Sequence, residues 1–347
     1  MKTNVSSDEL ATCKNLTPIN SKEITCISGN LTLATFYNVS GWARQCYNER
    51  PFDYVIMDEA SQALFGMIAA CKNLGHKTIW IGDQNQMQPI VLLSQETLIR
   101  NDYSMLANGF STLCENFDYK SYILTETYRL LKKSAALTSI FYHTSLKSVA
   151  NFDYVFKNTN ISYIPKDGGT ILVFKNMPIG EKADKESCEF TIGILEDILS
   201  FKPKLKIAVL TKFRASVRML QNCFIGKYGS KENVLIDTVE RVQGMTCDVC
   251  IYYIPNTMMG MSLDKSLFNV ATSRAKQLTI IIADNSILNT SCHRDVHSYL
   301  LEITSGIIPN QQKETSVEQE ENVIEKSNIK LHIKGKIDLS QFETQKQ

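Results

Sequence analysis

Two stretches of this sequence, YVIMDEASQ at residues 54–62 and TIWIGDQNQMQP at residues 78–89, decide the fold class. Each begins as an apolar run typical of a buried strand and then turns polar. The segment between them has the pattern of a helix that ends at a glycine. Because the ligands of open α/β sheets bind at the carboxyl ends of the strands, we expect Asp58, Glu59 and Gln86 to border one crevice.

The rest of the chain repeats this alternation of strand-like and helix-like segments. Apolar runs predict further strands at residues 170–174, 207–211, 250–254 and 278–283, and the stretches KESCEFTIGILEDILS and FRASVRMLQNCF favour helices. Near-continuous apolar strands that alternate with helices are typical of parallel sheets buried on both faces. The sequence therefore predicts an α/β protein.

Changes in composition along the chain indicate two domains, as the usual size of ~150 residues per domain also suggests. Residues 1–150 would form the first domain and residues 170–308 the second. The segment 151–169 between them mixes Asn, Pro and a Gly pair, which is typical of a linker. Residues 309–347 are polar and acid-rich, and we expect a flexible tail there that includes one strand-like run, IKLHIKGKIDL.

The overall composition excludes several classes of protein. The 347 residues include 37 Lys and Arg against 36 Asp and Glu, so the chain is neither globally basic nor globally acidic. No apolar run approaches the ~20 residues of a membrane span, and the polar first residues lack the apolar centre of a signal peptide. Ten cysteines without framework spacing predict reduced thiols in an intracellular protein, cytoplasmic or nuclear.

The motifs that carry chemistry occur in a fixed order. DEASQ and GDQNQMQP resemble motifs II and III of superfamily 1 helicases, in the branch typified by the nonsense-mediated-decay helicase. The stretches that follow resemble the later motifs of the same family: LTETYRL (124–130), IFYHTSL (140–146), VLTKFRASVRMLQ (209–221), DTVERVQGMTCDV (237–249) and FNVATSRAKQLTIII (268–282). This resemblance covers residues 25–285 and implies two RecA-like domains with parallel sheets, the first of them incomplete.

The resemblance also implies a role for each matching side chain in binding and hydrolysing ATP. Asp58 resembles the Mg²⁺ ligand, Glu59 the general base and Gln86 the sensor of the γ-phosphate. Arg129 and Arg274 resemble two arginine fingers, which suits the chemistry because one planar guanidinium holds two phosphoryl oxygens. Without this context, the ordinary interpretation of such an arginine is a weak surface ion pair.

Two further groups of residues complete the expected site. The resemblance assigns Asp83, Gly244 and Thr246 to the nucleotide, and Thr246 stands where the family often has a glutamate. It assigns three other side chains to nucleic acid, whether single-stranded or duplex RNA or DNA: Thr211, Lys212 and Thr238.

One motif of the family is missing from these 347 residues. The phosphate-cradling loop G-x-x-x-x-G-K-[ST] does not occur, and GHKT at residues 75–78, which imitates its ending, reads as a turn before a strand. We therefore expect the cradle to come from outside this sequence, either upstream or on a second chain, so hydrolysis by this chain alone is an open question. The function predicted is the carboxyl-terminal portion of an ATP-dependent helicase or translocase. The alternative is an ATP-independent nucleic-acid-binding or interaction subunit, or half of a split helicase.

A zinc site at Cys247 and Cys250 is the remaining alternative for these motifs. A structural zinc site needs four converging ligands. In an extended strand, residues three apart point to opposite faces, so we expect these two thiols to diverge. The sequence therefore predicts no structural zinc, with Mg²⁺ and ATP as the expected ligands.

Overall fold

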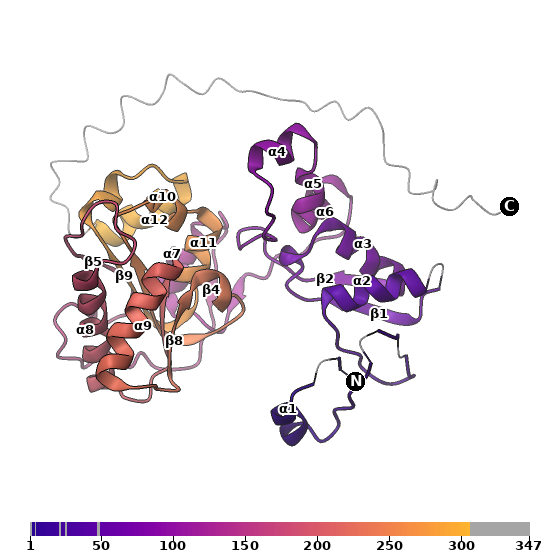
Figure 1. The fold of residues 1–347 in the computed structure, drawn as a ribbon, viewed down its shortest axis with the longest axis horizontal. Helices are drawn as coiled ribbons and strands as arrows, with labels where there is room; N and C mark the ends of the chain where they lie inside the picture. Colours follow the sequence, from indigo (N-terminus) through magenta and orange to yellow (C-terminus); the bar gives the residue numbers. More distant parts are fainter. Residues whose placement is uncertain (1, 4, 21, 25, 47–48, 306–347) are drawn as a thin grey trace. The chain divides into compact units, whose positions relative to one another are not determined.

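We describe the protein from a computed structural model that covers residues 2–3, 5–20, 22–24, 26–46 and 49–305 (Figure 1). The chain divides into two units, Met1–Ile303 and Thr304–Gln347, and the fold and site below belong to the first. The predicted flexible tail and its strand-like run lie outside the described residues. No helix within the described ranges has the length and apolar character needed to cross a membrane.

The first half of the described chain contains a small parallel sheet with helices. Its strands β1 (Phe52–Met57) and β2 (Gly75–Trp80) pair in parallel, with Met57 opposite Trp80. The other elements, in chain order, are α1 (Ser7–Thr12), α2 (Phe36–Gln45), the 3₁₀ turn η1 (Ala60–Gln62), α3 (Phe65–Leu74), α4 (Gln95–Arg100), α5 (Ser104–Ala107) and α6 (Gly109–Asn116). Helix α3 links the two strands, which confirms the predicted strand–helix–strand unit.

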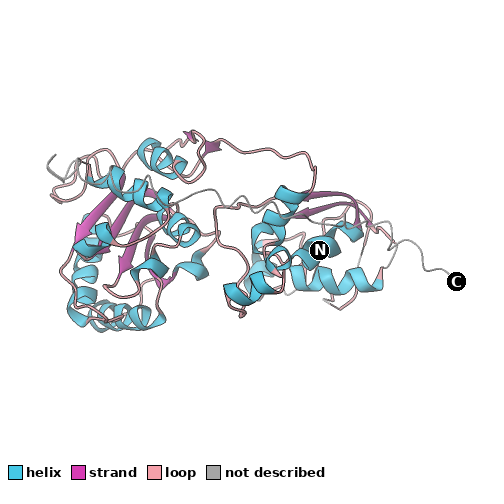
Figure 2. Ribbon diagram, turned by 90° about the horizontal axis from the view of Figure 1, so that it is seen from above, coloured by secondary structure: helices cyan, strands magenta, loops and turns pink. Residues whose placement is uncertain are grey.

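The two-stranded sheet differs from the prediction in two respects. Helix α3 ends at Leu74 and β2 starts at the next residue, so Gly75–Thr78 is strand rather than the predicted turn. Among the described residues, only one face of this sheet is covered by helices (Figure 2). Met57 packs there with residues of α3 and α6, whereas the other face exposes an apolar stripe. That stripe consists of Tyr54, Ile56, Ile79 and Ile81. The expectation of burial on both faces is therefore wrong here.

A short connecting region follows. Its two-residue strands β3 (Glu126–Thr127) and β4 (Lys147–Ser148) pair in parallel on either side of helix α7 (Lys132–Ser139). The side-chain hydroxyl of Ser148 donates to the carbonyl of Leu130, which fixes β4 beside the segment that precedes α7. This region therefore holds the chain around Arg129 in a defined position.

The second half of the described chain contains a five-stranded parallel sheet in the order β5-β9-β8-β6-β7. Its strands are β5 (Gly169–Phe174), β6 (Ile207–Thr211), β7 (Val234–Thr238), β8 (Cys247–Ile254) and β9 (Ala275–Ala283). Its helices and 3₁₀ turns are α8 (Lys185–Phe201), α9 (Arg214–Tyr228), η2 (Val239–Val242), α10 (Met259–Ser262), α11 (Lys265–Thr272), η3 (Asn285–Asn289) and α12 (Arg294–Thr304). Four of these strands were predicted, and β7 was not.

Both faces of this larger sheet are buried, as its apolar strands predict. One face packs against α8 and α9, and the other packs against α11 and α12 (Figure 2). Side chains of β8 alternate between the two hydrophobic cores, with Tyr252 in one and Tyr253 in the other. The α/β class with parallel sheets is therefore confirmed.

A β-bulge at the start of β8 changes the direction of one predicted side chain. The register between β8 and β9 shifts between Cys247 and Val249, so Cys247 and Cys250 face the same hydrophobic core. A hydrogen bond with Cys247, together with burial, raises the pKa of the Cys250 thiol well above its ordinary value. The expectation that the two thiols diverge is therefore wrong. Within the described ranges, no three side chains of the His, Cys, Asp or Glu type form a metal-binding group.

Candidate functional site

Two carboxylates follow directly after β1. Asp58 is exposed, and its Oδ1 accepts the backbone N–H of Glu59 at 3.0 Å. Glu59 is half-buried and adopts a left-handed backbone conformation (φ 53°), which is strained for a residue with a side chain. Its Oε2 lies 3.5 Å from the amide nitrogens of Gln62 and Gln243, so the strained turn directs this carboxylate toward the second half of the chain.

A tight turn after β2 carries the next polar group. Asp83 Oδ1 accepts the backbone N–H of Asn85 at 2.9 Å, and its Oδ2 accepts a hydrogen bond from Gln86 Nε2 at 2.8 Å. The amide oxygen of Gln86 in turn accepts a hydrogen bond from Arg274 Nη2 at 3.4 Å. The turn therefore places Gln86 between an acidic side chain and an arginine.

Arg274 is the most deeply buried charged group of the site, with 3% of its surface exposed. Besides Gln86, its guanidinium donates to the carbonyls of Val270 (3.0 Å) and Met245 (3.5 Å) and to the hydroxyl of Ser273 (3.3 Å). All of these acceptors are neutral. Burial, reinforced by repulsion from Arg129, lowers the pKa of Arg274 to about 10.

Arg129 lies beside Arg274 and is half-buried. Its Nη1 donates to the carbonyl of Ser273 at 3.3 Å, and burial lowers its pKa, an effect that the charge of Glu59 opposes. Within the described residues, neither arginine forms an ion pair with a carboxylate, since none of the observed ion pairs includes them. One buried and one half-buried guanidinium thus lie side by side without an ion-paired carboxylate, and the nearby charge of Glu59 opposes the effect of burial on both. This arrangement is costly unless an anion binds.

A cavity of about 480 Å³ opens beside these groups. Asp83, Gln86, Arg129 and Arg274 all line it, so four of the predicted residues border one space. The ring of Tyr128, 77% of which is exposed, lines it as well. Sequence reasoning did not single out Tyr128, although its place beside Arg129 in the Tyr-Arg motif was a usable signal.

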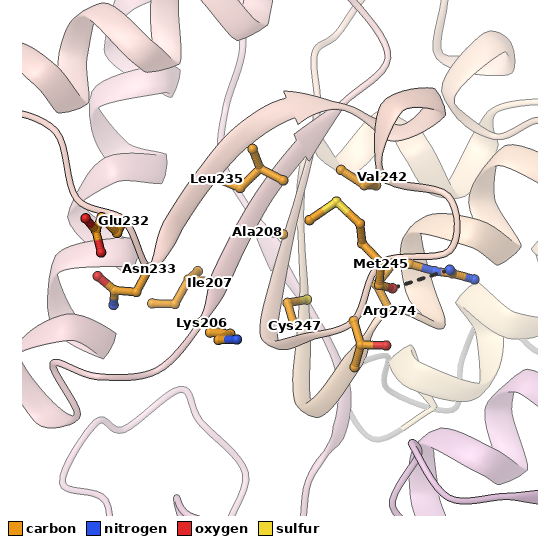
Figure 3. A pocket seen from close by; sticks show the side chains of 11 residues that line it. Lys206, Ile207, Ala208, Glu232, Asn233, Leu235, Val242, Met245, Cys247 and Arg274 are labelled. Carbon is orange, nitrogen blue, oxygen red and sulfur yellow. Dashed lines mark hydrogen bonds between the residues drawn. The ribbon is translucent and has the colours of Figure 1, made fainter. Parts of the chain in front are cut away.

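Gly244 and Thr246 approach the same arginine and glutamate from the loop before β8. Gly244 has a φ of +79°, and a Cβ built on it would stand 3.7 Å from Glu59 Oε1, so this backbone lies against the carboxylate. Thr246 lines a second cavity of about 250 Å³ that also touches Arg274 (Figure 3). The close-up shows Arg274 donating to the backbone of Met245 at the margin of that cavity. Arg274 therefore borders both spaces.

The three residues predicted to contact nucleic acid form a separate group. Thr211 and Thr238 are paired neighbours at the carboxyl ends of β6 and β7, and both are buried. Lys212 follows Thr211 and forms an ion pair with Glu240. None of the three lines either cavity described above. The structure thus brings Asp83, Gln86, Arg129 and Arg274 to one cavity, whereas Asp58 and Glu59 do not line it. The expected nucleic-acid group lies apart from this cavity, at the carboxyl ends of β6 and β7.

Comparison with known proteins identifies the family. A family model described as an AAA domain matches residues 105–286, which is more than half of the chain. The chain is 29% identical over 254 residues to an uncharacterized ATP-dependent helicase of Methanocaldococcus jannaschii, covering 68% of this chain and 36% of that protein. It is 27% identical over 282 residues to the DNA replication ATP-dependent helicase/nuclease DNA2 of Saccharomyces cerevisiae, covering 70% of this chain and 18% of that protein.

A third similar protein is the probable helicase senataxin of Homo sapiens, 25% identical over 293 residues, with 77% of this chain and 10% of that protein covered. Among solved structures, the arterivirus nonstructural protein 10 helicase is similar with a TM-score of 0.39 and 13% identity, covering 81% of this chain and 52% of that chain. The chain belongs to the AAA-domain family, and its relatives place it within a superfamily 1 helicase family. It spans little more than a third of the archaeal relative and less than a fifth of the other two.

Proposed function

We propose that this chain is the carboxyl-terminal portion of an ATP-dependent nucleic-acid helicase or translocase of the nonsense-mediated-decay-helicase-like branch. The observation that carries the proposal is the pair of guanidiniums of Arg129 and Arg274. They are adjacent, one half-buried and the other buried, and neither has an ion-paired carboxylate among the described residues. Such a pair favours a ligand with several adjacent negative charges, because each guanidinium can hold two phosphate oxygens. A nucleoside triphosphate has this charge pattern.

The cavity beside the arginines also suits the rest of a nucleotide. Its volume of about 480 Å³ falls in the range of small-molecule sites, roughly 300–1,000 Å³. The exposed ring of Tyr128 offers a face on which a base can stack, next to the arginine that would hold the phosphates. This arrangement supports nucleotide binding with the phosphates toward Arg274.

The carboxylates fit the remaining requirements of ATP hydrolysis. Mg²⁺ in nucleotide sites is usually held by one or two carboxylates together with phosphate oxygens, and exposed Asp58 at the end of β1 is such a ligand. The bound ion supplies positive charge to the phosphates. Glu59 is the residue that accepts a proton from the attacking water, because its strained turn and the backbone of Gly244 hold it close to the arginines.

The link to movement along a strand comes from where these groups lie in the chain. Gln86 and Arg129 belong to the proposed domain 1–150, and Arg274 belongs to the proposed domain 170–308. A triphosphate that contacts all three draws the two domains together, and its hydrolysis releases them. Thr211, Lys212 and Thr238, on the second domain, are the proposed contacts to the nucleic acid that is moved.

The proposal is tested by nucleotide binding to the chain itself. Isothermal titration calorimetry with MgATP should detect binding, and Arg274→Ala should weaken it at least about tenfold, the effect of losing ~1.4 kcal/mol. Arg294→Ala, a change at an exposed arginine at the start of α12, should leave the affinity unchanged. Wild-type protein that binds a single strand but shows no heat with MgATP would instead support an ATP-independent binding subunit.

Hydrolysis requires a second test, because the sequence contains no phosphate-cradling loop. Genomic DNA upstream of the first codon, translated in all frames, should encode G-x-x-x-x-G-K-[ST]. A polypeptide that joins that segment to this chain should hydrolyse ATP and be stimulated by single-stranded RNA or DNA. A joined polypeptide with the loop and without stimulated hydrolysis contradicts the helicase proposal.

A further inference from the structure

A hydrogen-bond network connects the turn after β2 with the helix that precedes Arg274. Its centre is Tyr142, whose hydroxyl donates to Asp83 Oδ2, the same oxygen that accepts from Gln86 Nε2. Burial and the negative charge of Asp83 raise the pKa of the Tyr142 phenol, so this hydroxyl stays protonated and remains a donor. Asp83 is thus held from both sides, by a phenol and by an amide.

Asn269 closes the network from the opposite direction. This side chain of α11 is fully buried, and its Nδ2 donates to Tyr142 Oη at 3.1 Å and to the carbonyl of Asn85 at 2.9 Å. Asn269 lies five positions before Arg274, whose Nη2 donates to Gln86. The contacts therefore form a ring that runs from Arg274 through Gln86, Asp83, Tyr142 and Asn269 and returns to Arg274 along the chain.

The ring determines which way the Gln86 amide faces. Because Asp83 is an acceptor, it selects the NH₂ end of the amide, and the oxygen end is left to face Arg274. An amide in the reverse orientation would present its donors to the guanidinium, which has no acceptor. The carboxylate of Asp83 therefore fixes Gln86, and Gln86 in turn fixes the Arg274 guanidinium beside the cavity.

We propose that Tyr142 is a positioning residue of the nucleotide site. By holding Asp83, its hydroxyl orients the Gln86 amide, and this amide in turn holds the Arg274 guanidinium in position to bind phosphate. This inference rests on the proposed function, and it adds a residue that lines the same cavity and acts on Arg274 through Asp83 and Gln86. It also gives α11 a direct connection to the state of the site, because Asn269 contacts both the hydroxyl and the turn. Side chains already held in the binding orientation lose less conformational entropy when the ligand binds, and a residue that holds them therefore affects the affinity.

A double-mutant cycle on MgATP affinity tests whether Tyr142 acts through Gln86. Tyr142→Phe should weaken binding about tenfold, the scale of one lost hydrogen bond to a charged acceptor. In a Gln86→Ala background the same substitution should change affinity less than about twofold, because the group that it orients is gone. Equal losses in both backgrounds would overturn the proposal, since they would mean that Tyr142 stabilises the fold without orienting Gln86.

Tyr154→Phe is the matched control. Tyr154 is another largely buried tyrosine with a raised pKa, and its hydroxyl donates to the carbonyl of Pro165, outside the ring. It should lose one hydrogen bond with no change in MgATP affinity. A loss in Tyr154→Phe equal to that in Tyr142→Phe would also overturn the proposal.

A measurement without nucleotide separates this inference from the proposed function. The side-chain NH₂ signals of Gln86 in a ¹⁵N NMR spectrum can be identified by their disappearance in Gln86→Ala. They should shift in Tyr142→Phe and stay in place in Tyr154→Phe. Unmoved signals in Tyr142→Phe reject the positioning role even if MgATP binds, whereas shifted signals in a protein that binds no MgATP support the ring and reject the proposed function alone.

Discussion

Arg274 and Gln86 are 188 residues apart in the chain, and Nη2 of the arginine lies 3.4 Å from Oε1 of the glutamine. This contact joins the turn after β2 to the segment that follows α11. It makes the most buried cation of the site depend on a neutral amide rather than on a carboxylate. The guanidinium therefore keeps its full charge available for an anion.

Replacement of the proposed general base separates chemistry from binding. Glu59→Gln keeps the shape of the side chain and removes its ability to take a proton, so strand-stimulated hydrolysis by the polypeptide that includes the upstream loop should fall at least ~100-fold. MgATP affinity should change little. Glu115→Gln, at an exposed position on α6, serves as the control. Unchanged turnover in Glu59→Gln contradicts the role assigned to Glu59.

Removal of the buried cation should stabilise the chain while it weakens nucleotide binding. A pKa lowered to about 10 corresponds to a penalty of roughly 3 kcal/mol for the charged side chain at neutral pH. The folded-state pKa lies below the unfolded value, so this penalty is present below about pH 10 and decreases as the pH rises toward 12.5. After the lost hydrogen bonds are deducted, Arg274→Met should raise the free energy of unfolding by about 1 kcal/mol.

Urea unfolding at neutral pH measures this gain, and calorimetry should show that Arg274→Met binds MgATP at least about tenfold more weakly. The exposed Arg294→Met should change neither quantity. A clear loss of stability in Arg274→Met would mean that the neutral acceptors around the guanidinium compensate its burial, which contradicts the account of the anion site.

The lowered pKa also predicts the pH dependence of nucleotide binding. A phosphate group needs Arg274 in its charged form, so affinity should stay constant between about pH 7 and 9 and fall as the pH rises through about 10. Well above that pH, each further unit should cost about tenfold. Titrations in Arg274→Ala should lack this decline. Identical pH profiles in the two proteins would show that another group controls the affinity.

The ion pair between Lys212 and Glu240 predicts opposite effects of its two partners on nucleic-acid binding. Glu240→Gln frees the lysine for a phosphate and should strengthen single-strand binding a few-fold, whereas Lys212→Ala should weaken it. The slope of log affinity against log salt should become shallower by about 1 in Lys212→Ala. Fluorescence anisotropy with a labelled strand at several salt concentrations measures both. Weaker binding in Glu240→Gln would contradict the assignment of Lys212.

The fold was predictable wherever burial alone determines the pattern. The apolar runs of β5, β6, β8 and β9 are continuous because both faces of their sheet are covered, and the sequence shows them directly. Strand β7, with the sequence VLIDT, was missed because its apolar run ends after three residues. The shared direction of Cys247 and Cys250 was missed because a β-bulge leaves no periodic signal.

The candidate site was predictable only as far as its motifs extend. The sequence could nominate Gln86, Arg129 and Arg274, and the structure places all three on one cavity, while their roles stay predictions. The ring through Tyr142 and Asn269 could not be inferred, because it depends on contacts between segments up to 188 residues apart. A tyrosine that serves this purpose has the same local sequence pattern as one that fills a core.

The apolar stripe on the open face of the β1–β2 pair has a practical consequence for work with the isolated chain. An apolar surface is exposed to solvent there, formed by Tyr54, Ile56, Ile79 and Ile81. Exposed apolar surface of this kind promotes self-association. Concentrated samples should therefore bind hydrophobic dyes and form oligomers. Threonine at Ile56 and Ile79 keeps the β-branched shape and would yield the better-behaved material for calorimetry and NMR.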